Sequence, residues 1–178
     1  SMKQVTIENK TFGLYLSEQA ILAEISQIAE EINIKYVDTT PLFVSILNGS
    51  FMFTSDLMKK IVIPCELSFL KISSYDGTSS TGKAKQLIGL NESIEGRDIL
   101  IIEDIIDTGF TMESIVSQLQ RQNPKSIRII TLLFKPDSLK VNIEPDYVCF
   151  SIPEKFVVGY GLDLNGLGRN LPDIYQLI

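Results

Sequence analysis

The chain contains no histidine among its 178 residues, and this absence removes several classes of catalytic site. A Ser-His-Asp triad, a Cys-His nucleophile and a His-based zinc protease motif all require an imidazole. Any acid–base chemistry must therefore come from Asp, Glu, Lys or Tyr side chains, or from the backbone.

Cysteine is also scarce, and long apolar runs are absent. Cys65 and Cys149 are far apart and form no CxxC pair, so neither a structural zinc site nor a redox pair is predicted. Both are expected to be small buried side chains in a reducing compartment. No apolar run approaches the roughly 20 residues that cross a bilayer, and no secretory leader is recognisable. The sequence therefore predicts a cytoplasmic protein without a membrane partner.

Net positive charge is absent as well. The formal net charge is −6 and the pI about 4.7, which predicts that nucleic acid is not a main partner. A small phosphorylated ligand remains compatible with this charge, because a local group of cations or a bound metal can hold it. The length, without internal repeats or long linkers, predicts one domain over residues 1–178.

Apolar runs alternate with amphipathic segments through the middle of the chain. Ser17 is expected to cap a helix that runs to about Tyr36, and further helices are expected at 50–60 and 110–122. Strands are expected at 42–47, 63–72, 86–90, 99–102, 127–134, 147–150 and 156–158. The small and polar segment 73–83 is expected to form a mobile surface loop. This alternation predicts an α/β fold with a mostly parallel, twisted sheet flanked by helices.

Polar residues follow the apolar strand at 99–102, where a parallel sheet binds ligands. Glu103 and Asp104 are adjacent carboxylates that repel each other unless a metal ion or a sugar diol neutralises them. The turn that follows, from Asp107 to Thr111, combines a glycine, two threonine hydroxyls and the start of a helix. Such a turn is suited to cradle a phosphate.

The segment Ile-Ile-Glu-Asp-Ile-Ile-Asp-Thr-Gly at 101–109 resembles the phosphoribosyl-pyrophosphate binding motif of the type I phosphoribosyltransferases. Its sequence is most similar to that of the hypoxanthine-guanine branch of this family. The resemblance implies that Glu103 and Asp104 hold the ribose hydroxyls, directly or through Mg²⁺, and that Asp107 lies beside N7 of the purine as general base or proton acceptor. It implies that the 5′-phosphate is bound by Asp107, Thr108, Gly109, Phe110 and Thr111. The Phe110 side chain is expected only to pack, since relatives often carry a polar or basic residue there.

Two segments resemble the family's pyrophosphate-binding parts. Asn48 and Gly49 stand where the family has a loop whose backbone amides bind pyrophosphate, although relatives often carry Lys or Arg in place of Asn48. Ser74 and Tyr75 begin a segment that resembles the flexible catalytic loop, which closes over the pyrophosphate and excludes water.

The later part of the chain resembles the family's base-binding parts. Lys135 follows the apolar strand at 127–134, and the resemblance implies that it donates to O6 of a 6-oxopurine. Phe156 is implied to stack on the purine, and the backbone of Val157 to read its edge. Asp163, also near the base, is implied to ligate a second Mg²⁺, and Arg169 to contact pyrophosphate. A small hood region built from the chain termini is implied too.

The resemblance implies transfer of 5-phosphoribosyl to N9 of hypoxanthine or guanine, by a homodimer or homotetramer. Three alternatives stay open. One is a regulator that senses phosphoribosyl pyrophosphate, and another is a phosphoribosyltransferase for xanthine or a pyrimidine. The third is a generic α/β nucleotide-binding domain, against which stands the absence of Gly-x-Gly-x-x-Gly and Walker-type loops.

Overall fold

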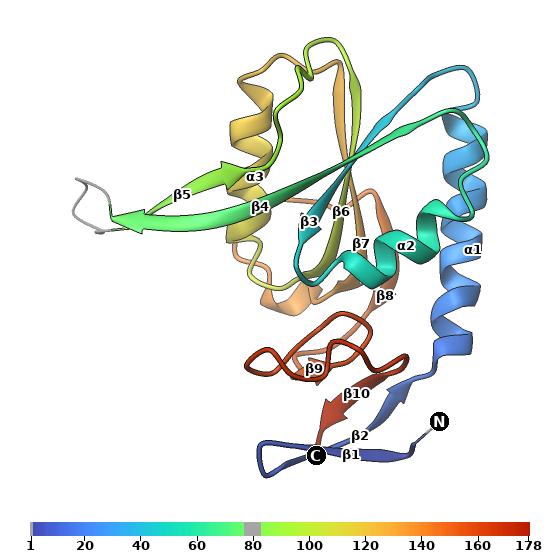
Figure 1. The fold of residues 1–178 in the computed structure, drawn as a ribbon, viewed down its shortest axis with the longest axis vertical. Helices are drawn as coiled ribbons and strands as arrows, with labels where there is room; N and C mark the ends of the chain where they lie inside the picture. Colours follow the sequence, from blue (N-terminus) through green and yellow to red (C-terminus); the bar gives the residue numbers. More distant parts are fainter. Residues whose placement is uncertain (1, 77–82) are drawn as a thin grey trace.

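The computed structural model describes residues 2–76 and 83–178, which form two sheets and three α-helices (Figure 1). The larger sheet has six strands in the order β5-β4-β3-β6-β7-β8, and all neighbours are parallel except β4 and β5. Its strands are β3 (Leu42–Leu47), β4 (Glu66–Asp76), β5 (Lys83–Ile88), β6 (Asp98–Ile106), β7 (Ser126–Phe134) and β8 (Tyr147–Ser151). The expected mostly parallel α/β sheet is confirmed.

Helices cover both faces of this sheet. Helices α1 (Glu18–Lys35) and α2 (Phe51–Met58) pack on one face, and α3 (Phe110–Gln120) packs on the other. Strand β6 serves both faces, because its side chains alternate: Leu100 and Ile102 lie with α1 and α2, while Ile99 and Ile101 lie with α3. This two-sided burial explains why the strand is continuously apolar.

Helix α1 follows the sequence prediction closely. The Ser17 hydroxyl accepts a hydrogen bond from the Ala20 N–H at 3.2 Å and so caps the first turn. The apolar stripe is spaced by three and four residues, and it is buried at Ile21, Ile25, Ile28, Ala29 and Ile32. None of the helices within the described ranges combines the length and apolar character that crossing a membrane demands.

The two ends of the chain together build the smaller sheet. Strands β1 (Gln4–Ile7), β2 (Lys10–Leu16), β10 (Ile174–Leu177) and β9 (Val157–Val158) lie in the order β1-β2-β10-β9, and all pairs are antiparallel. Its core consists of Phe12, Val158 and Tyr175, each at most 1% exposed. Figure 1 shows this sheet beyond the carboxyl end of the parallel strand β3. The hood region implied by the family resemblance is therefore present.

The segment 73–83 departs from the expectation of a surface loop. Strand β4 continues to Asp76 and β5 begins at Lys83, with Ser73 paired to Gln86 and Tyr75 to Ala84. The expectation was wrong at both ends of the segment, because antiparallel pairing uses the backbone and does not require apolar side chains. Residues 77–82 of the expected loop lie outside the described residues.

Strand β6 is also longer than predicted. It runs through Glu103 and Asp104 to Ile106, so the acidic pair lies inside the strand instead of after it. The reason is the neighbouring strand: β7 stays paired with β6 as far as Phe134, opposite Ile106, whereas the pairing with β3 ends at Ile102. The end of β6 therefore has one edge that β3 does not cover.

Candidate active site

A cleft of about 440 Å³ lies where β6 and β7 end and the smaller sheet begins. All four residues predicted for base binding line it, together with two of the acidic residues of β6 and its turn. The lining residues are Asp104, Ile105, Asp107, Lys135, Glu154, Lys155, Phe156, Val157, Leu162 and Asp163. The structure thus brings together side chains that are more than 50 positions apart in the sequence.

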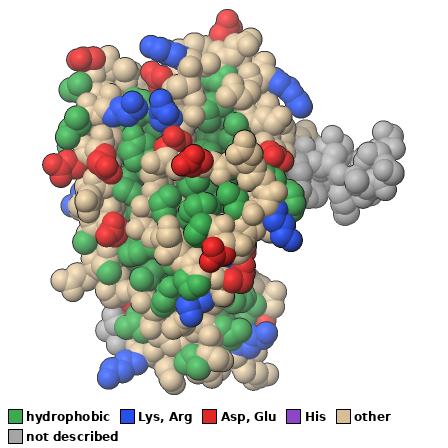
Figure 2. Space-filling view, turned by 180° about the vertical axis from the view of Figure 1, so that it is seen from behind, with side chains coloured by type: hydrophobic (Ala, Val, Ile, Leu, Met, Phe, Trp, Pro, Cys, Tyr) green, Lys and Arg blue, Asp and Glu red, His purple; other side chains and the backbone are tan. Residues whose placement is uncertain are grey.

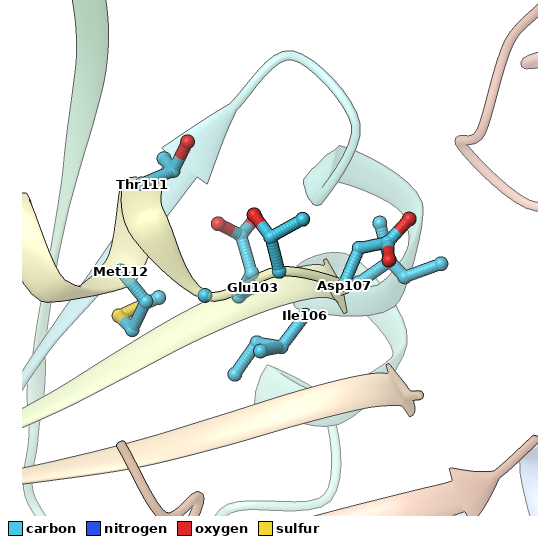
Figure 3. A pocket seen from close by; sticks show the side chains of 8 residues that line it. Glu103, Ile106, Asp107, Thr111 and Met112 are labelled. Carbon is cyan, nitrogen blue, oxygen red and sulfur yellow. The ribbon is translucent and has the colours of Figure 1, made fainter. Parts of the chain in front are cut away.

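A second and smaller pocket of about 110 Å³ lies at the turn between β6 and α3. Its lining residues are Glu103, Ile105, Ile106, Asp107, Thr108, Gly109, Thr111 and Met112. Figure 3 shows the side chains of Glu103, Asp107 and Thr111 around it. Asp107 lines both this pocket and the larger cleft, so it stands at the junction between them.

Gly109 shapes the smaller pocket. It has a φ of +89° and precedes the first residue of α3, so the turn adopts a left-handed conformation that favours glycine. An added Cβ would also lie 2.6 Å from Val141 Cγ2 and 2.7 Å from Leu139 Cδ1. The smaller pocket lies at the start of α3, and because the first backbone N–H groups of a helix have no acceptor within it, this position is suited to a phosphate. The Phe110 side chain is 56% exposed at the helix start, so packing covers only part of it.

Glu103 and Asp104 form a crowded pair of carboxyl groups. Glu103 is 7% exposed, and its Oε1 accepts a hydrogen bond from the Asp104 N–H at 3.0 Å. Asp104 Oδ1 accepts one from the Ile105 N–H at 2.8 Å. Burial and the neighbouring Asp104 charge raise the pKa of Glu103 well above its ordinary value, and burial also raises the pKa of Asp104. A cation or a diol at this position would relieve both effects.

The loop between β3 and α2 lies against Asp104. A Cβ added to Gly49 would be 1.9 Å from Asp104 Oδ2, so only glycine leaves the carboxylate in its place. The peptide bond between Leu47 and Asn48 in this loop is cis. On the other side, a Cβ added to Gly161 would be 2.2 Å from the Gly49 carbonyl oxygen. The predicted pyrophosphate loop is therefore in direct contact with the predicted ribose-binding residue.

Three buried hydroxyl groups on β3, on α2 and at the N-cap of α2 form a hydrogen-bonded network next to this loop. The Ser45 Oγ lies 2.7 Å from both Ser50 Oγ and Thr54 Oγ1. The Ser50 hydroxyl also donates to the Ile46 carbonyl oxygen at 2.5 Å. Sequence reasoning missed this network because the three residues are unremarkable small polar side chains whose contact depends on how α2 packs on β3.

Arg169 and Asp163 form a pair at the edge of the cleft. Arg169 Nη1 donates to the Gly161 carbonyl oxygen at 2.6 Å, and its Nη2 lies 3.3 Å from Asp163 Oδ1. Asp163 Oδ2 accepts a hydrogen bond from the Gly166 N–H at 2.7 Å. Arg169 also acts electrostatically to lower the pKa of Asp104, against the larger effect of burial. The predicted pyrophosphate-contacting arginine therefore belongs to the same site as the acidic pair.

Lys135 is a buried cation at the end of β7. Its side chain is 7% exposed, and its Nζ lies 3.3 Å from Asp107 Oδ2 and 3.1 Å from Glu154 Oε1. Two carboxylates therefore compensate the burial of one ammonium group. Sequence reasoning missed Glu154, because an acidic residue that follows a proline outside any strand carries no signal of its own.

The smaller sheet presents Phe156 and Val157 to the cleft. Phe156 is 40% exposed, and its ring meets that of Phe12 edge to face, with centroids 6.0 Å apart and planes at 85°. Val157 is buried in β9, where it pairs with Gln176 of β10. Phe156 therefore contributes an aromatic ring to the lining of the cleft.

Ser74 and Tyr75 lie in β4, paired through their backbones with Lys85 and Ala84. Their side chains lie outside what the structure describes. Their predicted closing role stays a prediction.

The donor groups of the site suit Mg²⁺ held jointly with a ligand. Within residues 2–76 and 83–178, no three acidic, cysteine or histidine side chains gather into a complete metal cage. Mg²⁺ commonly takes only one or two carboxylates and completes its shell with water and ligand phosphates. The adjacent carboxyl groups of Glu103 and Asp104, which burial and mutual repulsion destabilise as anions, fit that requirement.

Comparison with known proteins agrees with this geometry. Residues 13–165 match the phosphoribosyl transferase domain family. The hypoxanthine-guanine phosphoribosyltransferase of Bacillus subtilis is 44% identical over 160 residues, covering 89% of each chain. That of Streptococcus pyogenes is 43% identical over 167 residues, covering 93% of each. A crystal structure of a hypoxanthine phosphoribosyltransferase from Staphylococcus aureus superposes with a TM-score of 0.86 at 44% identity, covering 93% of this chain and 90% of that one. This chain therefore belongs to the phosphoribosyltransferase family, and within it to the hypoxanthine-guanine phosphoribosyltransferases.

Proposed function

We propose that this protein transfers the 5-phosphoribosyl group of phosphoribosyl pyrophosphate to N9 of hypoxanthine or guanine, in purine salvage. The products are IMP or GMP and pyrophosphate. The observation that carries this proposal is the position of Asp107, which lines both the phosphate-sized pocket and the base-sized cleft. One carboxylate can therefore act between a sugar phosphate and a purine.

The smaller pocket is the proposed site of the 5′-phosphate. The turn of Asp107, Thr108, Gly109, Phe110 and Thr111 offers backbone amides and hydroxyls at the start of α3, where the helix dipole favours an anion. Glu103 and Asp104, on the adjacent part of β6, hold the ribose hydroxyls. Their raised pKa values support this role, because partners that neutralise the pair are favoured there.

The larger cleft is the proposed site of the base. Phe156 stacks on the purine ring, the backbone of Val157 reads its edge, and Lys135 donates to O6. The buried ammonium next to Asp107 supports this arrangement, since it holds a donor and an acceptor side by side. Asp107 accepts or shares the N7 proton as N9 becomes nucleophilic.

The pyrophosphate is proposed to bind between the β3–α2 loop and Arg169. The backbone of Asn48 and Gly49 supplies amide donors, and the contacts of Gly49 with Asp104 and Gly161 support their placement. Ser74 and Tyr75 close over this group from β4. Glu103, Asp104 and Asp163 hold Mg²⁺, which supplies neutralisation of the leaving pyrophosphate. These residues are proposed to act within a single domain that spans the chain.

The assay for this proposal is nucleotide formation with Mg²⁺, phosphoribosyl pyrophosphate and one base at a time. Hypoxanthine and guanine are expected to be converted, with xanthine and pyrimidines compared in the same series. Asp107→Asn is expected to lower kcat by about 10²- to 10⁴-fold, the usual range for loss of a general base, while the Kd of the nucleotide product changes little. Absence of product with every 6-oxopurine contradicts the proposed function, and binding without turnover indicates a regulatory protein instead.

We infer that the protein acts as a homodimer or homotetramer in the cytoplasm without nucleic acid. Apolar side chains on β4 and β5 support an assembly: Leu67, Phe69 and Ile88 are 37%, 42% and 50% exposed, around a groove of about 440 Å³. On the face in Figure 2, Lys and Arg are interspersed with Asp and Glu, so that face carries no extended basic patch of the kind that binds nucleic acid. Light scattering at several concentrations measures the assembly.

A further inference from the structure

The ammonium group of Lys135 is held by two carboxylates from different parts of the chain. Asp107 follows β6, and Glu154 lies between β8 and β9. Their oxygens are 3.3 Å and 3.1 Å from Lys135 Nζ. An ammonium group has three N–H donors. Two contacts therefore leave one donor, and because the three N–H bonds are tetrahedrally arranged, the first two determine where the third points.

Glu154 is itself held in place. Its Oε1 contacts Lys135, and its Oε2 accepts a hydrogen bond from the Ser138 hydroxyl, in the short helix Pro136–Ser138 that follows β7. The hydrogen bonds from Ser138 and Lys135 lower the pKa of Glu154, so the carboxylate stays ionised. Glu154 is also two residues before Phe156, and all three of Lys135, Glu154 and Phe156 line the cleft.

We propose that Glu154 is a positioning residue for base selectivity: it holds the Lys135 ammonium so that the remaining N–H is presented to the 6-oxo group of the purine. This inference rests on the proposed function, in which Lys135 reads O6. Without Glu154, the ammonium turns toward Asp107 alone, and the residue that must accept the N7 proton becomes its only partner. Glu154 thus keeps the donor and the acceptor of the base site in separate roles.

The test variant is Glu154→Gln, which keeps the shape of the side chain and removes its charge. The matched control is Asp137→Asn, which removes one negative charge from an exposed position on the neighbouring short helix, outside the cleft lining. Glu154→Gln is expected to raise KM for hypoxanthine by about three- to fivefold, as for the loss of one partly exposed ion pair. KM for phosphoribosyl pyrophosphate is expected to stay within about twofold. Asp137→Asn is expected to leave both constants unchanged.

Selectivity provides the readout that a general structural defect would not move. With unsubstituted purine, which has no 6-oxo group, Glu154→Gln is expected to leave KM unchanged. In a Lys135→Met background, the effect of Glu154→Gln on hypoxanthine is expected to vanish, because the residue through which it acts is gone. Ser138→Ala removes the hydrogen bond to Glu154 but leaves the carboxylate its charge. This variant is expected to raise KM for hypoxanthine by a smaller factor than Glu154→Gln does.

Two outcomes overturn the inference while leaving the proposed function intact. One is wild-type-like KM for hypoxanthine in Glu154→Gln, and the other is an equal effect of that change in the Lys135→Met background. Failure of the proposed function is distinguishable, because the unmodified protein then forms no nucleotide from any 6-oxopurine.

Discussion

Replacing Gly49 by alanine isolates the contact between the β3–α2 loop and the acidic pair. The backbone of Gly49 does not adopt a positive φ, so alanine is conformationally acceptable and only space is at issue. The new Cβ lies 1.9 Å from Asp104 Oδ2 and 2.8 Å from its Cγ. Since ordinary contacts between such atoms begin at roughly 3.5 Å, the carboxylate must move by about 1.5 Å. Asp104 is then displaced from the position in which it is proposed to hold the ribose hydroxyls.

The expected loss of activity follows from the proposed role of Asp104, which is to hold the ribose hydroxyls. Hydrogen bonds to a charged group contribute about 1.5–3 kcal/mol, so Gly49→Ala is expected to lower kcat/KM for phosphoribosyl pyrophosphate by about 10- to 100-fold. The obstacle is the end of one side chain, and the free energy of unfolding is therefore expected to change by less than about 1 kcal/mol. Steady-state rates at saturating hypoxanthine measure the first quantity, and urea denaturation measures the second.

Gly96 provides a matched control, since it has a φ of +71° and no atom within 4 Å of an added Cβ. Gly96→Ala is expected to lower the free energy of unfolding by about 1–2 kcal/mol, through backbone conformation alone, and to leave the rates unchanged. The reasoning is refuted if Gly49→Ala keeps wild-type kcat/KM. It is also refuted if this variant loses stability and activity together, since Gly49 then serves the fold.

Three further predictions concern buried polar groups. Burial and the Asp104 charge raise the pKa of Glu103 above its ordinary 4.5, so the stability that it contributes is complete below about that pH and is lost as the pH rises through the folded value. The Tm of Glu103→Gln without Mg²⁺ should therefore exceed that of the wild type by an increasing amount as the pH rises above about 5, and a constant difference in scanning fluorimetry contradicts this. Burial raises the pKa of the Cys149 thiol to about 12, so iodoacetamide near pH 8 should label the half-buried Cys65 first. Peptide mass spectrometry measures the labelling, and the two cysteines should be labelled equally only in urea. The fully buried Tyr160 donates to Asp56 Oδ2 at 2.5 Å, and Tyr160→Phe should lower the free energy of unfolding in urea by about 1–3 kcal/mol, with no loss indicating that water replaces the donor.

The parts of the fold that depend on nearby residues were predictable from the sequence. The Ser17 cap and the spacing of isoleucines specify α1, and the apolar run specifies most of β6. The turn around Gly109 was predictable for the same reason, because its amides, hydroxyls and left-handed glycine are consecutive in the chain. Its position at the smaller pocket follows from that local structure.

The parts that depend on distant partners were not predictable from patterns alone. The end of β6 could not be placed, because its continuation through Glu103 and Asp104 depends on β7. The β1–β2 hairpin has alternating apolar residues at Val5, Ile7, Phe12 and Leu14, but its place in a sheet with β9 and β10 depends on the other end of the chain, and only the family resemblance implied a hood from the chain termini. Glu154 is the clearest case, since its contacts with Lys135 and Ser138 join residues 19 and 16 positions apart across two loops.

The smaller sheet has a consequence for the order in which the site is assembled. Strand β10 lies between β2 and β9, and its register sets Leu177 opposite Phe12, so the first and last parts of the chain must meet before this sheet exists. The turn between β6 and α3 needs only its own neighbourhood. Contacts between residues far apart in the sequence form slowly, and the elements that depend on them open most readily. We therefore expect the phosphate-binding turn between β6 and α3 to form early and the smaller sheet beside the base site to form last. A partly opened molecule of this protein would then still hold a sugar phosphate after it had lost the ability to choose a base.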